Sequence, residues 1–289
     1  MRKSFVLLVV CCLVIAQGVA YSSDIERRET ATKTLRFGTA AGDKRVIVDN
    51  VFGSIDVTGY DGEVVEMTVH KTLTARSEKK AEEAEDEVTL KIYEDDDVIE
   101  LYVDGPFRER YGRGSHWRGY KREGYKVNFD FEVKVPRGCA VELSTINNGD
   151  ISASQLKGEF DVSNVNGAIE LKGMSGSGDV YTVNGKLTVE YDENPQSDCS
   201  FGTVNGDVRL YFQRGLSADF YMKTMNGEVY TDFDVAALPV KTSTSQSRNG
   251  KKVYKVGHMT GVRAGRGGPE IEMKTLNGDM YILSGKGER

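Results

Sequence analysis

Apolar residues recur at fixed positions around a series of Asn-Gly pairs in the second half of the chain. The pairs are Asn148-Gly149, Asn166-Gly167, Asn184-Gly185, Asn205-Gly206, Asn226-Gly227 and Asn277-Gly278. Successive glycines of these pairs are 18, 18, 21, 21 and 51 residues apart. Because asparagine and glycine tolerate positive φ angles, each pair predicts a tight turn. Self-similarity at a near-constant spacing is typical of stacked repeat proteins.

The residues that flank each pair predict strands. Apolar side chains recur five and two residues before the glycine, and two and four residues after it. Around Gly206 these residues are Phe201, Val204, Val208 and Leu210. Side chains alternate between the two faces of a strand, so Val208 and Leu210 share one face. We also expect Val204 to face inward and its neighbour Thr203 to face outward. The pattern predicts an all-β fold, a parallel β-solenoid or β-helix of stacked 18–21-residue coils.

One more copy of this pattern lies far upstream, around Gly53. Its apolar positions are Val48, Val51, Ile55 and Val57. Between this first coil and the coil at Gly149, alternating or β-branched residues predict strands over 63–75, 87–93, 97–104 and 125–135. The charged run over 77–87 predicts a short helix, and Ser77 is its expected N-cap.

These patterns divide the chain into a leader, a linker and one repeat domain. The predicted parts are a signal peptide over 1–20, a flexible segment over 21–34 and a β-solenoid domain over 35–289, with an excursion over 59–136 and repeat coils over 137–284. The Ser/Thr-rich stretch 241–250 and the Gly-rich stretch 261–268 are expected to be loops.

The first twenty residues have the pattern of a secretory signal. Arg2 and Lys3 precede an apolar run over 5–16, and small residues at Gly18 and Ala20 mark a cleavage site near Ala20. The run is shorter than the ~20 residues of a comfortable membrane span. A lipid-anchored form through the Cys11-Cys12 pair is the alternative, although two valines precede that pair. After removal of the signal we expect no transmembrane segment and a periplasmic or secreted protein.

Charge narrows the range of partners. The chain has 44 Asp and Glu residues against 38 Lys and Arg residues, a net charge of −6. Loss of Arg2 and Lys3 with the signal peptide takes the mature chain from −6 to −8. General nucleic-acid binding needs a cationic surface, so no nucleic-acid partner is expected.

Two cysteines remain after signal removal, Cys139 and Cys199. The repeat pattern places them three coils apart. At about 4.8 Å per coil they would lie well beyond the ~7 Å Cα separation that a disulfide tolerates. We expect both thiols to be free.

The turns and their order resemble a known bacterial family. The matching stretches are T-V-N-G-D-V over 203–208, T-M-N-G-E-V over 224–229 and T-L-N-G-D-M over 275–280. Together with the signal peptide, the excursion and its strand ending at Pro136, they resemble the exported β-strand-repeat proteins named putative adhesins, a domain of unknown function. The resemblance covers about residues 35–284 and implies fold and location more directly than activity.

An acidic residue follows the glycine in several turns, which raises the question of chemistry on the scaffold. The acidic positions are Asp150, Asp207, Glu228 and Asp279, whereas Ala168 and Lys186 interrupt the column. Stacked carboxylates can bind Ca²⁺ or act as an acid–base pair. The alternative is that they are solvated turn residues that stabilise each corner. The histidines His70, His116 and His258 lack metal-ligand spacing. We predict no catalytic residue, no metal and no cofactor.

The segment 105–126 is the strongest candidate binding feature. Its cations interleave with aromatic residues, and the candidate ligand-contacting residues are Arg113, Trp117, Arg118, Tyr120 and Arg122. Aromatic rings stack on sugars, and arginines bind carboxylates and phosphates. An anionic glycan, a lipid headgroup or an envelope protein would suit this composition. The alternative is a solvated hairpin loop whose cations pair with the acidic run 94–97.

Three classes of function remain open. The leading hypothesis is a non-enzymatic, adhesin-like binding scaffold of the bacterial cell envelope, because a solenoid presents long flat faces. The second is a carbohydrate-active β-helix enzyme. The third is a structural or stress-linked envelope protein that acts through a protein partner.

Overall fold

The computed structural model describes residues 4–5, 24–38, 42–108, 124–241, 246–248, 251–253 and 259–285. It divides the chain into two compact units, unit 1 over Met1–Ala153 and unit 2 over Ser154–Arg289. The predicted signal peptide, with its cleavage site, lies almost entirely outside the described residues. Among the residues described, no helix is long and apolar enough to span a membrane.

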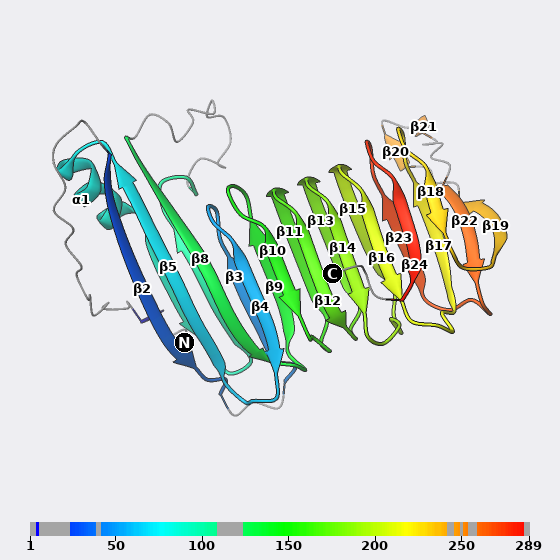
Figure 1. Ribbon diagram of the computed structural model, residues 1–289, viewed down its shortest axis with the longest axis horizontal. Coiled ribbons are helices and arrows are strands. Elements are labelled where there is room, and N and C mark those ends of the chain that lie inside the picture. The colour runs from blue at the N-terminus through cyan, green and yellow to red at the C-terminus, as the bar shows by residue number, and fades with distance from the viewer. Residues whose placement is uncertain are drawn as a thin grey trace. The chain divides into compact units, whose positions relative to one another are not determined.

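Unit 1 contains two groups of strands. The first group runs in the order β1 (Ser4–Phe5), β6 (Thr89–Glu94), β7 (Val98–Asp104), β3 (Arg45–Asp49) and β9 (Ala140–Thr145). The second runs in the order β10 (Ile151–Ser154), β4 (Ile55–Tyr60), β8 (Tyr125–Pro136), β5 (Val65–Ala75) and β2 (Ile25–Leu35). The coil strands β3 and β4 pair in parallel with their neighbours. Strand β5 of the excursion pairs antiparallel with β2 on one side and with β8 on the other (Figure 1).

The excursion matches the sequence pattern closely. All four predicted strands form, as β5, β6, β7 and β8. Helix α1 spans Glu78–Glu87, and the Ser77 side chain accepts a hydrogen bond from the Lys80 backbone N–H. Ala81 and Ala84 are the buried face of this otherwise charged helix, which packs on β5 and β8. The first coil is also confirmed, since Val48, Val51, Ile55 and Val57 are all buried.

Unit 2 is the regular repeat. One of its sheets has the order β11 (Phe160–Asn166), β13 (Gly178–Asn184), β15 (Cys199–Asn205), β23 (Glu270–Lys274), β17 (Ala218–Lys223), β22 (Met259–Ala264) and β19 (Val235–Lys241). The other has the order β12 (Ile169–Met174), β14 (Leu187–Tyr191), β16 (Val208–Phe212), β24 (Met280–Ser284) and β18 (Val229–Thr231). A separate hairpin joins β20 (Gln246–Arg248) to β21 (Lys251–Val253). Figure 1 shows the coil strands of this unit side by side.

The coils of unit 2 do not follow chain order. The last coil of the sequence, β23 and β24, lies between the coil of β15 and β16 and the coil of β17 and β18. The 51-residue spacing between the last two turns is taken up by the chain that leads from β18 to β23. The intervening chain forms β19 and β22, which extend one sheet beyond β17 through antiparallel pairing.

Three expectations from the sequence are wrong. Residues 25–35 are not a flexible segment, because they form β2 along the full length of β5. Residues 261–264 belong to β22 and not to a loop. Thr203 faces inward and is 3% exposed, whereas Val204 is only half-buried. The reason is strand alternation: Phe201 is buried, so a residue three positions away must face the other side.

Candidate functional site

The predicted ligand-contacting residues lie outside the described part of the chain. Arg113, Trp117, Arg118, Tyr120 and Arg122 fall within the gap between residues 108 and 124. The structure does place both ends of the segment 105–126, and each end is held firmly in unit 1.

The first end is fixed by Arg108. Its guanidinium donates to both carboxylate oxygens of Asp49, at 2.9 and 3.0 Å, and to the Val103 carbonyl at 2.9 Å. It also lies 4.4 Å from the ring centre of Tyr102. An arginine fork held bidentately and stacked on an aromatic ring keeps one geometry. This cation is therefore a structural anchor of the segment.

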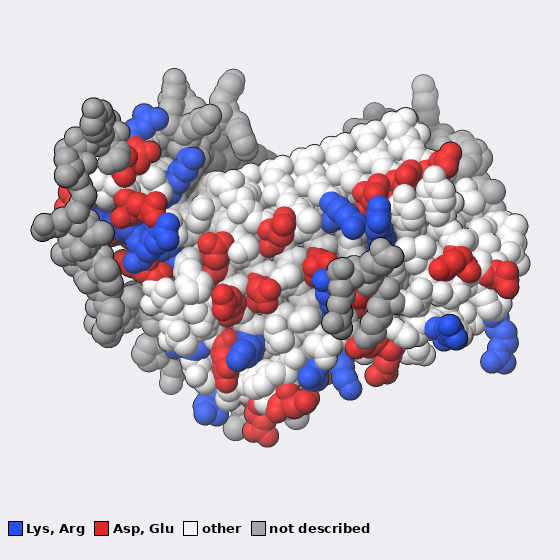
Figure 2. Space-filling view, in the orientation of Figure 1, with Lys and Arg blue, Asp and Glu red and all other residues white. Residues whose placement is uncertain are grey.

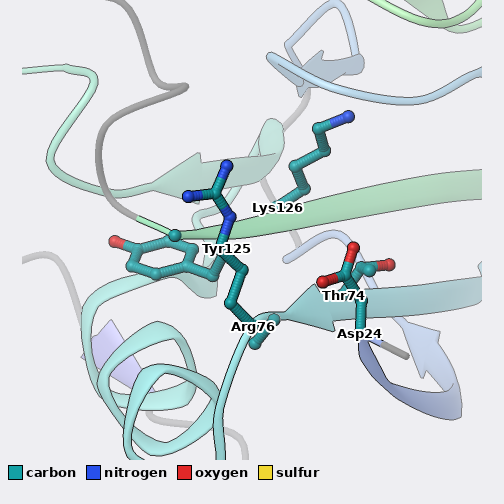
Figure 3. Close-up of a pocket in the computed structure, with 7 residues that line it drawn as sticks. Asp24, Thr74, Arg76, Tyr125 and Lys126 are labelled. Carbon is teal, nitrogen blue, oxygen red and sulfur yellow. The ribbon is translucent and has the colours of Figure 1, made fainter. Parts of the chain in front are cut away.

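The second end opens onto a pocket. β2 begins, β5 ends and β8 begins at this place, and the cavity there has a volume of about 200 Å³. Its lining residues are Asp24, Thr74, Ala75, Arg76, Gly124, Tyr125 and Lys126. Figure 3 shows that its two cations come from the residue after β5 and from β8, while its one carboxylate comes from the residue before β2. The lining therefore has a positive balance.

The backbone fixes the pocket's wall. Gly124 has a φ of +80°, a conformation that L side chains rarely adopt, and its carbonyl accepts a hydrogen bond from the Arg76 backbone N–H at 3.0 Å. The buried Tyr125 donates its hydroxyl to Glu87 at the end of α1. One wall of the pocket thus consists of a hydrogen-bonded tyrosine and a glycine turn.

In unit 2 the T-x-N-G motif builds three ladders along the stack. Side-chain amides bond from coil to coil at 2.7–2.9 Å: the ladder starts at Asn166, which accepts, and each of the following asparagines donates to the one before it, in the order Asn184, Asn205, Asn277 and Asn226. Each threonine hydroxyl donates to a glycine carbonyl of the neighbouring coil, at 3.0–3.2 Å, through Thr182, Thr203, Thr275 and Thr224. The asparagines are therefore turn and ladder residues.

The glycines form the third ladder. A Cβ on Gly206 would lie 2.1 Å from the Gly185 carbonyl oxygen, and one on Gly278 would lie 2.0 Å from that of Gly206. Real Cβ atoms do not approach an oxygen so closely. Close backbone approach between coils, in addition to turn conformation, is what this motif requires of glycine.

The acidic column has a structural use. Asp207 accepts a hydrogen bond from the Asp279 backbone N–H at 3.1 Å, and Asp279 accepts one from the Glu228 N–H at 2.9 Å. Figure 2 shows a row of acidic side chains over this part of unit 2. Within the described ranges, no group of three or more His, Cys, Asp or Glu side chains could hold a metal ion.

An outward-facing stack three residues after the glycine was missed in the sequence. The Arg209 guanidinium lies 4.6 Å from the ring centre of Tyr281, which stacks on Tyr230 at 5.0 Å. Tyr230 donates its hydroxyl to Glu228 at 2.7 Å, and this hydrogen bond raises the pKa of Tyr230 to about 12. Alignment of the repeats would have found this column.

Both mature cysteines are free and buried, which confirms that expectation. Burial raises the pKa of Cys139 to about 11 and also raises the pKa of Cys199. Neither thiol is exposed enough, or ionised enough near neutral pH, to suggest a nucleophile.

The repeat geometry agrees with a comparison of the sequence with known families. Residues 138–261 match the family described as Toastrack DUF4097. The match to the Toastrack family is confined to this part of the chain. This match confirms the expected family of β-strand-repeat proteins, a domain of unknown function. No curated protein has a sequence that matches the chain.

Solved structures similar to this chain carry names from cell adhesion and lipid binding. A putative cell adhesion protein from Clostridium sporogenes ATCC 15579 has 10% identity and a TM-score of 0.45, covering 89% of this chain and 100% of its own. A putative adhesin from Bacteroides fragilis NCTC 9343 has 8% identity and a TM-score of 0.40, covering 89% and 97%. A putative lipid binding protein from Parabacteroides distasonis ATCC 8503 has 10% identity and a TM-score of 0.25, also covering 89% and 97%. At these scores the neighbours identify no ligand for this chain.

Proposed function

We propose that this protein is an exported, non-enzymatic, adhesin-like binding scaffold of the bacterial cell envelope, periplasmic or secreted after cleavage near Ala20. We further propose that the segment 105–126 contacts an anionic ligand, which would be a glycan, a lipid headgroup or an acidic surface of an envelope protein. Arg113, Trp117, Arg118, Tyr120 and Arg122 are the proposed contact residues.

The observation that carries this proposal is the cationic pocket at the second end of the segment. Arg76 and Lys126 line it against a single carboxylate, Asp24, in a chain whose net charge is negative. Lys126 is itself the last residue of the aromatic and basic segment. Arginine and lysine side chains around a small cavity favour carboxylate, sulfate or phosphate groups.

The carboxylates of the repeat support a binding scaffold over an enzyme. A glycosidase needs two carboxyl groups that face the scissile bond. Asp207 and Asp279 instead each accept a backbone N–H of the neighbouring coil. Their oxygens hold the stack together, which favours the structural interpretation of the acidic column.

A binding screen with the mature chain tests the proposal. The probes are a glycan array and vesicles of phosphatidylglycerol or phosphatidylcholine, with a pull-down from envelope extract as the protein arm. We expect binding to anionic probes only, and Trp117→Ala should weaken it about tenfold with little change in melting temperature. Arg76→Gln with Lys126→Gln should flatten its salt dependence, because exposed charges are screened over ~8–10 Å.

A matched control comes from unit 2. Lys157 is an exposed cation there, so Lys157→Gln should leave affinity and salt dependence unchanged. Equal affinity of the Trp117 variant and the native chain for every bound probe would contradict the proposed contact residues. Release of reducing sugars from a polysaccharide would contradict the non-enzymatic proposal.

A further inference from the structure

The two sheets of unit 2 end differently. One sheet continues beyond β17 through β22 and β19, whereas the other stops at β18 within the described residues. Val229 in β18 is 39% exposed, although the equivalent residues in the other coils, Ile169, Leu187, Val208 and Met280, are buried. Met225 and Tyr230 beside it are 74% and 43% exposed. The core column of the repeat therefore opens to solvent at β18.

Within the part of the chain that the structure describes, the side of β18 away from β24 has no strand partner. The Glu228 carbonyl accepts the Met280 N–H at 2.9 Å, and the Asp232 N–H donates to the Ile282 carbonyl at 3.3 Å, so both residues bond to β24. In a parallel ladder alternate residues bond to opposite sides. The N–H and C=O groups of Val229 and Thr231 therefore point away from β24, along the open edge.

The side-chain ladders also end at β18, and their hydrogen bonds all run in one direction from donor to acceptor. In the inner turns the next coil donates to the asparagine Oδ1 and the glycine carbonyl, and at Asp207 and Asp279 it also donates to the acidic side chain. In the last coil the corresponding acceptors are Asn226 Oδ1, the Gly227 carbonyl and the Glu228 carboxylate, and no further coil follows among the described residues. The ladder groups of Asn226, Gly227 and Glu228 are thus acceptors spaced for one more strand.

The charge around the edge is negative. Residues 224–234 contain Glu228, Asp232 and Asp234 but no lysine or arginine. Two copies of this edge would place carboxylate against carboxylate and acceptor against acceptor. A second copy of the chain is therefore a poor occupant, and a cationic strand is a good one.

We propose that β18 is a docking edge for an extended, cationic segment of a partner protein, which adds to it as a parallel strand. Main-chain hydrogen bonds to Val229 and Thr231 supply affinity, and the acceptors of Asn226, Gly227 and Glu228 supply register. This surface lies in unit 2, is acidic, and is independent of the anion-binding function proposed for unit 1.

A peptide taken from an inner coil is the probe. The peptide 181–191 carries Thr182, Asn184 and Gly185 at the ladder positions and has Lys186 at the acidic column. Parallel addition places Lys186 beside Glu228, and Glu190→Lys in the peptide adds a cation beside Asp232. Fluorescence anisotropy with this labelled peptide should show saturable binding that weakens as salt is raised.

Two matched changes locate the binding. Gly185→Val in the peptide should weaken binding at least tenfold, since inner-coil glycines leave only about 2 Å for a Cβ above the neighbouring carbonyl. Val229→Pro in the protein should weaken it at least tenfold as well. It removes an outward N–H without removing a bond to β24, so the melting temperature should stay close to that of the native chain.

A charge exchange guards against a folding artefact. The Glu228→Lys protein should bind the cationic peptide more weakly than the native protein does. It should bind the peptide that carries Lys186→Glu and the native Glu190 more tightly than the native protein does. Equal binding of the Gly185→Val peptide would overturn the proposal. So would slow hydrogen exchange of the Val229 and Thr231 amides in the free protein, or a concentration-dependent dimer that Val229→Pro abolishes, because the edge would then already be covered.

Discussion

The excursion of unit 1 and the coils of unit 2 are both β-sheet, but different interactions hold them. Strands β2, β5 and β8 in unit 1 have 11, 11 and 12 residues, and β5 pairs antiparallel with both of the others along its length. Coil strands such as β14 and β16 have 5 residues each. A strand this short makes few bonds, so the coils depend on side-chain columns that repeat from coil to coil. In unit 2 the loss of stability caused by a substitution therefore depends on which repeated side-chain position, or column, it changes.

The largest test of this difference is a glycine of the stack. Gly206→Val would bring a Cβ within 2.1 Å of the Gly185 carbonyl oxygen and should lower the free energy of unfolding by about 4 kcal/mol or more. Gly138→Ala in unit 1 is the matched control, because nothing lies within 4 Å of its added Cβ. Urea unfolding of both variants measures the contrast. Equal stability of the two variants would show that neighbouring coils can move apart to make room for the added side chain, which would contradict the prediction.

The next test exchanges neighbouring columns. Thr203 is buried and donates to the Gly185 carbonyl at 3.1 Å, whereas the half-buried Val204 faces outward. Thr203→Asp places a carboxylate in the core and should cost about 3 kcal/mol. Val204→Asp should cost less than about 1 kcal/mol, and urea melts compare the two. A larger loss for the Val204 variant would contradict the observed alternation.

A smaller loss of stability is expected for substitutions in the exposed asparagine ladder. Asn205 both donates to Asn184 and accepts from Asn277, at 2.8 Å each, so Asn205→Ala should cost about 1–2 kcal/mol. Asn226 makes one such bond at the end of the ladder, and Asn226→Ala should cost about half as much. In unit 1 the exposed Thr32–Thr68 pair, 3.5 Å apart, has no ladder, so Thr68→Ala should be nearly neutral. Thermal melts would rank the three variants.

The sequence predicted the excursion better than the spatial order of the coils. Strands β5 to β8 and helix α1 show strong local patterns, so their alternation and the Ser77 cap were sufficient. Strand β2 carries charged or polar residues on both faces, so its local pattern is weak, and it pairs with β5 along its length and makes ion pairs such as Arg27–Glu85. The insertion of β23 and β24 leaves no local signal, since every coil carries the same motif.

The candidate sites also differ in how much of each can be predicted from the sequence. The cations of the segment 105–126 are visible as composition, whereas the pocket of Arg76 and Lys126 depends on where three strands meet. The open edge at β18 follows from which coil is last in space, and its motif is ordinary. Sequence patterns identify the strands and their ladder residues, whereas the structure identifies the strand whose hydrogen-bonding groups lie at an open edge.

The smallest effect concerns Tyr230 at that edge. Its hydrogen bond to Glu228 raises the folded-state pKa to about 12, above the ordinary value of 10.0. A group whose pKa is raised by folding stabilises the fold while it is protonated. The contribution is therefore complete below pH 10 and should disappear as pH rises through 12.

The comparison of the native chain with Tyr230→Phe isolates this contribution. The difference in their melting temperatures should be small and constant from pH 7 to 9 and should vanish near pH 12, because other groups titrate alike in both proteins. Absorbance at 295 nm should show one phenol fewer in the late part of the variant's titration. A difference that grows with pH would mean that the Glu228 carboxylate destabilises Tyr230 by repulsion instead of accepting its proton in a hydrogen bond.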